Sequence, residues 1–185
     1  MANVHLALVH YPVYNKKGEE VVSSVTTLDV HDISRACTTF QVANFFIVTP
    51  LKSQQELVNR MVEHWQTGYG AEYNPTRTEA LLKTVVKRSL EDVIDSIEHD
   101  FGKKPKTVVT GAKRAEKSLS FEEMKKELTG PGDILLIFGT GWGLVKHLMQ
   151  KADCILEPIE GRGEYNHLPV RAAIAIILDR LLSEK

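Results

Sequence analysis

Short apolar runs alternate with amphipathic segments along the chain, and this alternation predicts strands and helices in turn. The predicted strands cover residues 4–11, 45–48, 84–86, 107–110, 133–138 and 154–156. Helices are predicted at residues 27–40, 53–65, 90–99 and from 120 to the turn at 129–132, and a last helix opens within residues 166–171. Because strands and helices alternate, and no two-residue hairpin turn joins consecutive strands, the sequence predicts an α/β fold. We expect a mostly parallel sheet with helices on both faces.

Local signals set the expected helix boundaries. Ser120 and Glu123 form a capping-box pattern, and Ser53 and Glu56 repeat it. Asp29 is placed to accept from the first N–H groups of its helix. Residues 67–75 contain two glycines and two tyrosines, and they are predicted to form an ordered loop.

The composition indicates an ordinary globular protein. Apolar residues make up 43% of the 185 residues and charged residues 25%, and the formal net charge is −1. Overall charge therefore gives no sign of nucleic-acid binding, although a local basic patch remains compatible with it. We expect residues 1–185 to form a single domain, in the cytoplasm and without a membrane span. The two cysteines and seven histidines have no metal-type spacing, so no metal site is expected.

Two glycine-containing turns follow consecutive predicted strands near the end of the chain. Residues 139–143 come directly after one strand, and residues 158–163 follow the next. Ligands of open α/β sheets lie outside the carboxyl ends of strands, and glycine lets the backbone approach them closely. Three alternating glycines exceed the needs of a tight turn, so the sequence predicts one small-molecule pocket built from backbone. The spacing is not the G-x-G-x-x-G of dinucleotide-binding folds, which disfavours a nicotinamide cofactor.

Four segments together resemble the SPOUT superfamily of S-adenosylmethionine-dependent RNA methyltransferases. Residues 135–144, 158–161 and 168–174 are similar to the strand-and-glycine segment, the second loop and the last helix of its ribose 2′-O branch. Residues 29–36 are similar to its first motif, in which an asparagine precedes a functional arginine by six positions. The resemblance covers the N-terminal forty residues and the C-terminal fifty, while the middle matches only in its rhythm of strands and helices.

The resemblance implies a deep trefoil knot near the C-terminus, a homodimer with the active site at its interface, and tRNA or rRNA as the substrate. It also implies that backbone groups hold S-adenosylmethionine. The residues expected to bind the cofactor are Thr110, Gly139, Thr140, Gly141, Trp142, Gly143, Pro158, Ile159, Gly161, Leu168 and Val170.

Other residues are expected to prepare the RNA. By resemblance Arg35 contacts phosphate or assists deprotonation of the nucleophile, although an arginine on a helix surface is the alternative. Asn166 and His167 are the other catalytic candidates. Asn166 is also a natural helix cap, and His167 is either a general base or a half-buried structural residue. The residues expected to contact RNA are Lys113, Arg114, Tyr69 and Arg77.

The chain departs from the family pattern close to the chemistry. Asp29 replaces the usual asparagine, Gly141 replaces an acidic residue, and His167 and Pro169 replace an asparagine and a serine. These changes leave methylation of a base nitrogen open beside the ribose oxygen. They also motivate a second hypothesis, a catalytically silent module that binds cofactor or RNA. A nicotinamide-dependent oxidoreductase is the third.

Overall fold

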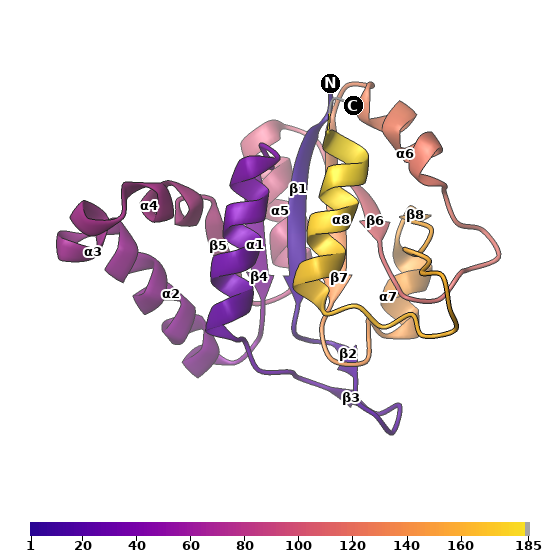
Figure 1. Ribbon diagram of the computed structural model, residues 1–185, viewed down its shortest axis with the longest axis horizontal. Coiled ribbons are helices and arrows are strands. Elements are labelled where there is room, and N and C mark those ends of the chain that lie inside the picture. Colours follow the sequence, from indigo (N-terminus) through magenta and orange to yellow (C-terminus); the bar gives the residue numbers. More distant parts are fainter. Residues whose placement is uncertain (184–185) are drawn as a thin grey trace.

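Six parallel strands form the central sheet of the computed structural model, which describes residues 1–183 (Figure 1). The strand order is β5-β4-β1-β7-β6-β8, and every pairing within this sheet is parallel. The strands are β1 (Asn3–Val9), β4 (Asn44–Val48), β5 (Thr84–Lys87), β6 (Lys106–Val109), β7 (Asp133–Gly139) and β8 (Cys154–Ile155). The predicted α/β class and mostly parallel sheet are confirmed.

Helices cover both faces of this sheet (Figure 1). They are α1 (Thr27–Thr39), α2 (Lys52–Gln66), α3 (Gly68–Tyr73), α4 (Pro75–Leu81), α5 (Leu90–Phe101), α6 (Phe121–Leu128), α7 (Lys146–Lys151) and α8 (Val170–Leu182). The apolar residues of α1, α2, α6 and α8 share one core with one face of the sheet, and those of α5 and α7 share a second core with the other. The segment from α2 to α4, residues 52–81, projects to one side of the sheet, and we call it the arm.

The two cores explain why the strands have continuous apolar sequences. Along β1, Leu6 and Leu8 point into the first core and Ala7 and Val9 into the second, and all four are fully buried. A strand covered by helices on both faces has no side exposed to water, so apolar residues occupy every position instead of alternate ones.

Several predicted boundaries are wrong. Residues 67–75 are not a loop, because α3 occupies most of this range and Pro75 begins α4. Proline is well tolerated in the first turn of a helix, and the Asn74 side chain caps α4 by accepting from the Arg77 N–H. Ser53 does not cap α2, which begins one residue earlier without a side-chain cap. The predicted capping box at Ser120 and Glu123 is present.

Three further details differ from the sequence interpretation. The last helix begins at Val170 with Pro169 at its N-cap, so Asn166 lies outside it and does not cap it. Thr26 caps α1 by accepting from the Asp29 N–H, so the cap is Thr26. A small antiparallel pair, β2 (Val13–Tyr14) and β3 (Glu20–Val21), follows β1 and was not predicted.

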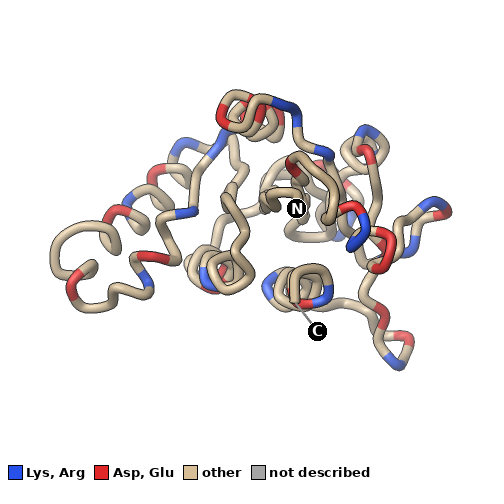
Figure 2. The backbone as a smooth tube through the Cα atoms, turned by 90° about the horizontal axis from the view of Figure 1, so that it is seen from above, with Lys and Arg blue, Asp and Glu red and all other residues tan. Residues whose placement is uncertain are grey.

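Charge is mixed over the molecule. Figure 2 shows blue and red positions interspersed along helices and loops. Any recognition of RNA phosphates must therefore come from local groups of cations. Within residues 1–183, none of the helices has the length and apolar character needed to cross a membrane.

Candidate active site

Three loops leave the sheet at the same edge. Strands β6, β7 and β8 are parallel neighbours in register, so their carboxyl ends lie side by side. Thr110 follows β6, is buried, and donates both its backbone N–H and its hydroxyl to the carbonyl of Ile137, at 3.0 and 3.1 Å. The structure thus brings together the two glycine-containing loops that the sequence assigned to one pocket, which here span residues 139–145 and 157–169. It adds the loop of residues 110–119, of which the sequence assigned only Thr110 to the cofactor.

The first glycine loop has a conformation that requires its glycines. A Cβ on Gly139 would lie 2.7 Å from the backbone nitrogen of Leu144. Gly141 and Gly143 have φ of 59° and 99°, in the left-handed region. The interpretation that three glycines exceed the needs of a turn is therefore wrong, because the turn itself accounts for each of them. The case for a ligand rests instead on the convergence of the loops.

Residues near the N-terminus anchor this first loop. The Trp142 N–H donates to the carbonyl of Tyr14 at 2.9 Å, and the Tyr14 N–H donates back to the carbonyl of Gly143 at 2.9 Å. The Thr140 hydroxyl donates to the carbonyl of Val9 at 3.0 Å and is also hydrogen-bonded to the hydroxyl of Ser23. The loop is consequently held rigidly on the end of β1.

Buried His10 completes that anchor. Its Nδ1 lies 3.0 Å from Ser23 Oγ, whereas its Nε2 is buried without a hydrogen-bond partner among the described residues. Burial lowers the pKa of His10 from 6.5 to about 4, so the ring is neutral at physiological pH. Sequence reasoning missed His10, Ser23 and Tyr14. Only the position of His10 inside the first predicted strand, residues 4–11, could have marked it.

The second loop, residues 157–169, is irregular and largely exposed. Pro158 is buried and Ile159 is partly buried against the core, which fixes the start of the loop. From Pro158 to Leu168 the backbone makes no backbone–backbone hydrogen bond within the described part of the chain. Gly161 here has an ordinary φ, and a Cβ would meet only the carbonyl oxygen of Tyr165, at 3.7 Å. This stretch therefore presents free backbone donors and acceptors to a ligand.

Apolar side chains are exposed on the same two loops. Trp142 is 62% exposed, Tyr165 80% and Leu168 45%. Exposed residues of this size, grouped on loops at the end of a sheet, offer a surface that a flat heterocycle can cover. The two loops thus expose apolar side chains beside backbone groups that have no partner among the described residues.

Ion pairs tie the second loop to the loop after β6. The Arg114 guanidinium lies 3.1 Å from Glu160 and 3.6 Å from Glu157. The Asn166 amide donates to the carbonyl of Ala112 at 3.1 Å. Arg114 and Asn166 therefore hold the two loops together. Lys113, the other predicted RNA contact on this loop, has no ion pair among the described residues.

At the start of α8, Arg171 lies 3.7 Å from Asp29 and 3.6 Å from Asp32 on α1. Arg171 therefore forms an ion pair that joins α8 to α1. His167 is exposed and contacts the ring of Tyr165 edge-on at 5.5 Å between centroids. Residues 1–183 contain no cluster of three or more potential metal ligands.

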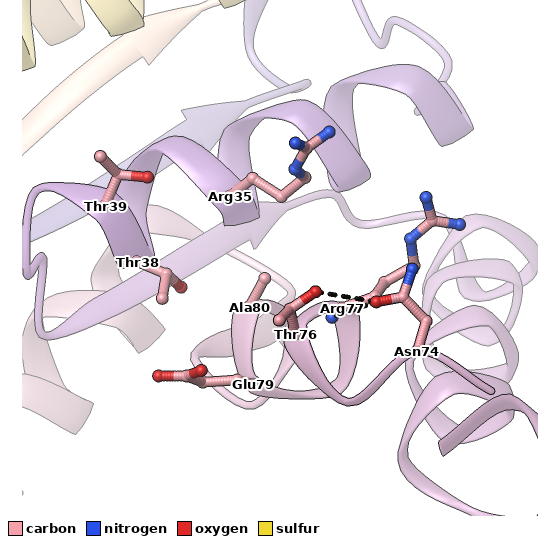
Figure 3. Close-up of a pocket in the computed structure, with 8 residues that line it drawn as sticks. All are labelled: Arg35, Thr38, Thr39, Asn74, Thr76, Arg77, Glu79 and Ala80. Carbon is pink, nitrogen blue, oxygen red and sulfur yellow. Dashed lines mark hydrogen bonds between the residues drawn. The ribbon is translucent and has the colours of Figure 1, made fainter. Parts of the chain in front are cut away.

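The remaining predicted residues lie on the other side of α1. Arg35 and Arg77 line the same cavity of about 310 Å³ between α1 and α4 (Figure 3). Tyr69 is exposed on the neighbouring helix α3. The structure therefore separates the predicted site residues into two groups, the loop edge and this cavity.

A mostly parallel α/β sheet whose last three strands end in converging loops defines a class of nucleotide-binding folds. The chain belongs to the family of S-adenosylmethionine-dependent RNA methyltransferases, whose family model matches residues 3–183. The predicted enzyme class and cofactor are confirmed.

Two relatives show the extent of the match. An uncharacterized protein of Aquifex aeolicus is 40% identical over 182 residues, which cover 98% of this chain and 89% of that protein. A tRNA (guanine-N(1)-)-methyltransferase of Oleidesulfovibrio alaskensis is also 40% identical over 182 residues. That match covers 98% of this chain and 42% of the longer protein, so the chain spans less than half of this relative.

Solved structures confirm the SPOUT-type fold. The SpoU methyltransferase AviRb from Streptomyces viridochromogenes has a TM-score of 0.62 at 15% identity, covering 97% of this chain and 58% of that one. An AdoMet-bound rRNA methyltransferase from Sinorhizobium meliloti has a TM-score of 0.58 at 13% identity, covering 97% and 55%. At these identities the likeness concerns the fold alone.

Proposed function

We propose that this chain, as a single domain, transfers a methyl group from S-adenosylmethionine to a nucleotide of tRNA or rRNA, at a ribose 2′-oxygen or a base nitrogen. The observation that carries the proposal is the convergence of three loops at one edge of the sheet, one of them with unpaired backbone groups. The names of the longer relatives support tRNA as the substrate. The Oleidesulfovibrio alaskensis relative is named for guanine N1, but this chain spans only 42% of that protein. Guanine N1 is therefore one acceptor to test among others.

The cofactor would lie on the exposed surface formed by the first and second loops. Backbone groups of Pro158, Ile159 and Gly161 would hold it on one side, and those of Leu168 and Val170 on the other. The first loop would close the site from Gly139 to Gly143, with Thr110 at its base. S-adenosylmethionine, when bound, supplies an electrophilic methyl group, and the protein supplies alignment and charge.

Transfer to a ribose hydroxyl or to a base nitrogen that carries a hydrogen releases one proton from the RNA acceptor. In the proposed arrangement the exposed imidazole of His167 accepts this proton, because it stands on the second loop beside the surface assigned to the cofactor. Asn166 fixes the loop on which His167 stands, through its bond to Ala112. Arg35, from a second copy of the chain, would hold the RNA backbone at the target nucleotide.

A deep trefoil knot and a homodimer belong to this proposal. After β7, in the middle of the sheet, the chain moves out to β8 at the edge and returns as α8, which packs on α1 and α6 (Figure 1). Ala172, Ala173 and Ile176 of α8 are only partly buried, and Leu28 on α1 is 59% exposed. These apolar positions support a second copy docked on α1 and α8.

Both cysteines are free thiols, in keeping with a cytoplasmic protein.

Calorimetric titration tests the cofactor site directly. We expect saturable, micromolar binding of S-adenosylmethionine and of its demethylated product, and none of NAD. Binding of NAD instead would favour the oxidoreductase. Cofactor binding without methyl transfer to any RNA from cells that lack the protein would favour the silent module.

Light scattering tests the assembly. The homodimer should have twice the chain mass of 20.8 kDa. A monomer at micromolar concentration would contradict the shared active site.

A further inference from the structure

The cavity between α1 and α4 is polar and carries two cations. Arg35 contributes from α1 and Arg77 from α4, together with the hydroxyls of Thr38 and Thr76. Figure 3 shows the two guanidinium groups on the same side of the cavity, with the carboxylate of Glu79 directed away from both. The cavity volume of about 310 Å³ is large enough for a phosphate group.

Neither arginine has its charge neutralised by the protein. Among residues 1–183, no carboxylate oxygen lies within 4.0 Å of the guanidinium nitrogens of Arg35 or Arg77. Arg114 and Arg171, in contrast, each have two carboxylate partners. Two unpaired guanidinium groups that line one cavity form a ready acceptor for an anion, since each presents a planar fork of donors.

Neighbouring side chains hold Arg77 in place before any ligand arrives. Its guanidinium carbon lies 4.4 Å from the centre of the Trp65 ring, which His31 contacts edge-on at 6.0 Å. Burial, with a smaller contribution from the Arg77 charge, lowers the pKa of His31, so this ring adds no positive charge near neutral pH. The Asn74 side-chain oxygen accepts from the backbone N–H of Arg77 and from the Thr76 hydroxyl. Within residues 1–183 its amide nitrogen has no hydrogen-bond partner, so it can donate to a ligand.

A pair of tyrosines lies directly before this group in the chain. Tyr69 and Tyr73 on α3 are 75% and 71% exposed, and their rings stack with centroids 5.7 Å apart and planes 25° apart. Tyr73 is followed at once by Asn74. Exposed aromatic faces beside unpaired arginines are the combination that binds single-stranded nucleic acid, because bases stack on the rings while phosphates meet the cations.

We infer that the arm and the facing side of α1 form an RNA-binding element, in which the cavity lined by Arg35, Asn74 and Arg77 holds a phosphate of an unpaired strand and the tyrosines stack with its bases. The inference rests on the proposed RNA substrate and adds a contact site outside the three loops. It explains why the chain places a rigid arginine and an exposed aromatic pair on a segment that projects from the sheet.

Fluorescence anisotropy with the whole protein tests this site, using fluorescein-labelled unfractionated tRNA and a mixed-sequence single-stranded RNA of about twelve nucleotides. Arg77→Gln should weaken binding to the single-stranded RNA about 10-fold and reduce the dependence of log affinity on log salt by about 0.7, the slope for one phosphate contact on a single strand. Arg35→Gln, which removes an exposed side chain, should have the same effect. Tyr69→Ser should weaken binding about 5-fold and leave the salt slope unchanged.

Arg60→Gln is the matched control for lost charge. Arg60 lies on α2 in the same arm, and its side chain is 80% exposed at 4.0 Å from Glu56. It should change affinity less than about twofold. Equal losses in the Arg60, Arg77 and Arg35 variants would overturn the cavity as a site, as would equally tight binding of duplex DNA. Cofactor titration of the same variants separates this result from the proposed function. Each variant should keep the cofactor affinity of the unmodified protein. A parallel loss of cofactor and RNA affinity would indicate a folding defect and would overturn the assignment of the RNA site.

Discussion

Replacing Gly161 by leucine is expected to weaken S-adenosylmethionine binding about 10- to 100-fold while the unfolding temperature stays unchanged. A Cβ at this position meets only one protein atom, at 3.7 Å, and φ is ordinary, so the folded chain accepts a side chain here. A ligand held by the backbone of the second loop would meet that side chain directly. Forcing several extra carbons into a filled site costs about 1–3 kcal/mol or more, equivalent to about 10- to 100-fold in affinity. Titration calorimetry and thermal unfolding measure the two quantities.

Gly163→Leu is the matched control, because a Cβ there has no heavy atom within 4 Å and the residue lies on the same loop. Its affinity for the cofactor should stay within a few-fold of the unmodified protein. Unchanged affinity in both variants would place the cofactor elsewhere. Gly139 is unsuitable for this test, since its side chain would collide with Leu144 even without a ligand.

Lowering the pH from 7 to 5 is expected to reduce the free energy of unfolding by about 2 kcal/mol through His10, and by about 3 kcal/mol at pH 4. The pKa of His10 falls from 6.5 in the unfolded chain to about 4 in the folded protein because the ring is buried. The unfolded state therefore binds the proton first, so stability is complete above pH 6.5 and is lost as the pH falls toward 4. Burial also lowers the pKa of His5, which adds an effect of the same sign. Urea unfolding at a series of pH values measures the change.

His10→Gln removes this titration and should flatten the profile between pH 7 and 5. His147→Gln, which replaces an exposed histidine on α7, should leave the slope as it is in the unmodified protein. A steep slope retained in the His10 variant would assign the acid sensitivity to another group. Because His10 supports Ser23, and Ser23 supports Thr140, cofactor affinity should stay constant from pH 7 to 5 and decline only as the pH approaches about 4, where His10 of the folded protein takes up a proton.

The sequence predicted the sheet well because its signals are local and redundant. The strands are apolar runs, the central strands β1, β4 and β7 are buried along almost their whole length, and the capping box at Ser120 and Glu123 fixes one helix start. Helix α2 of the arm was predicted, but α3 and α4 were missed because Gly68, Gly70 and Pro75 are typical of loops. In the structure Pro75 occupies the first turn of α4, and Gly70 packs so closely that a Cβ would lie 2.3 Å from the backbone oxygen of His64. Tertiary packing thus outweighed local propensity.

The candidate site was predicted in its parts but not in its arrangement. The carboxyl ends of parallel strands lie at one edge of a sheet, so the convergence of the glycine loops could be expected from the sequence, although the position of β6 between β7 and β8 could not. No periodicity relates Arg35 to Arg77, which lie on separate helices, and their shared cavity became visible only in three dimensions. The pairing of Arg114 with Glu157 and Glu160 was equally hidden, because it joins loops that follow different strands.

The place of β1 in the middle of the sheet has a consequence for synthesis on the ribosome. Its partner on one side, β4, follows closely in the chain, but its partner on the other side is β7, and Asn3 and Asp133 are 130 positions apart. Until β7 emerges, the nascent sheet of β5, β4 and β1 has an open, apolar strand edge that can pair with other chains. The speed of translation between β5 and β7 therefore determines how long each new molecule remains prone to aggregation.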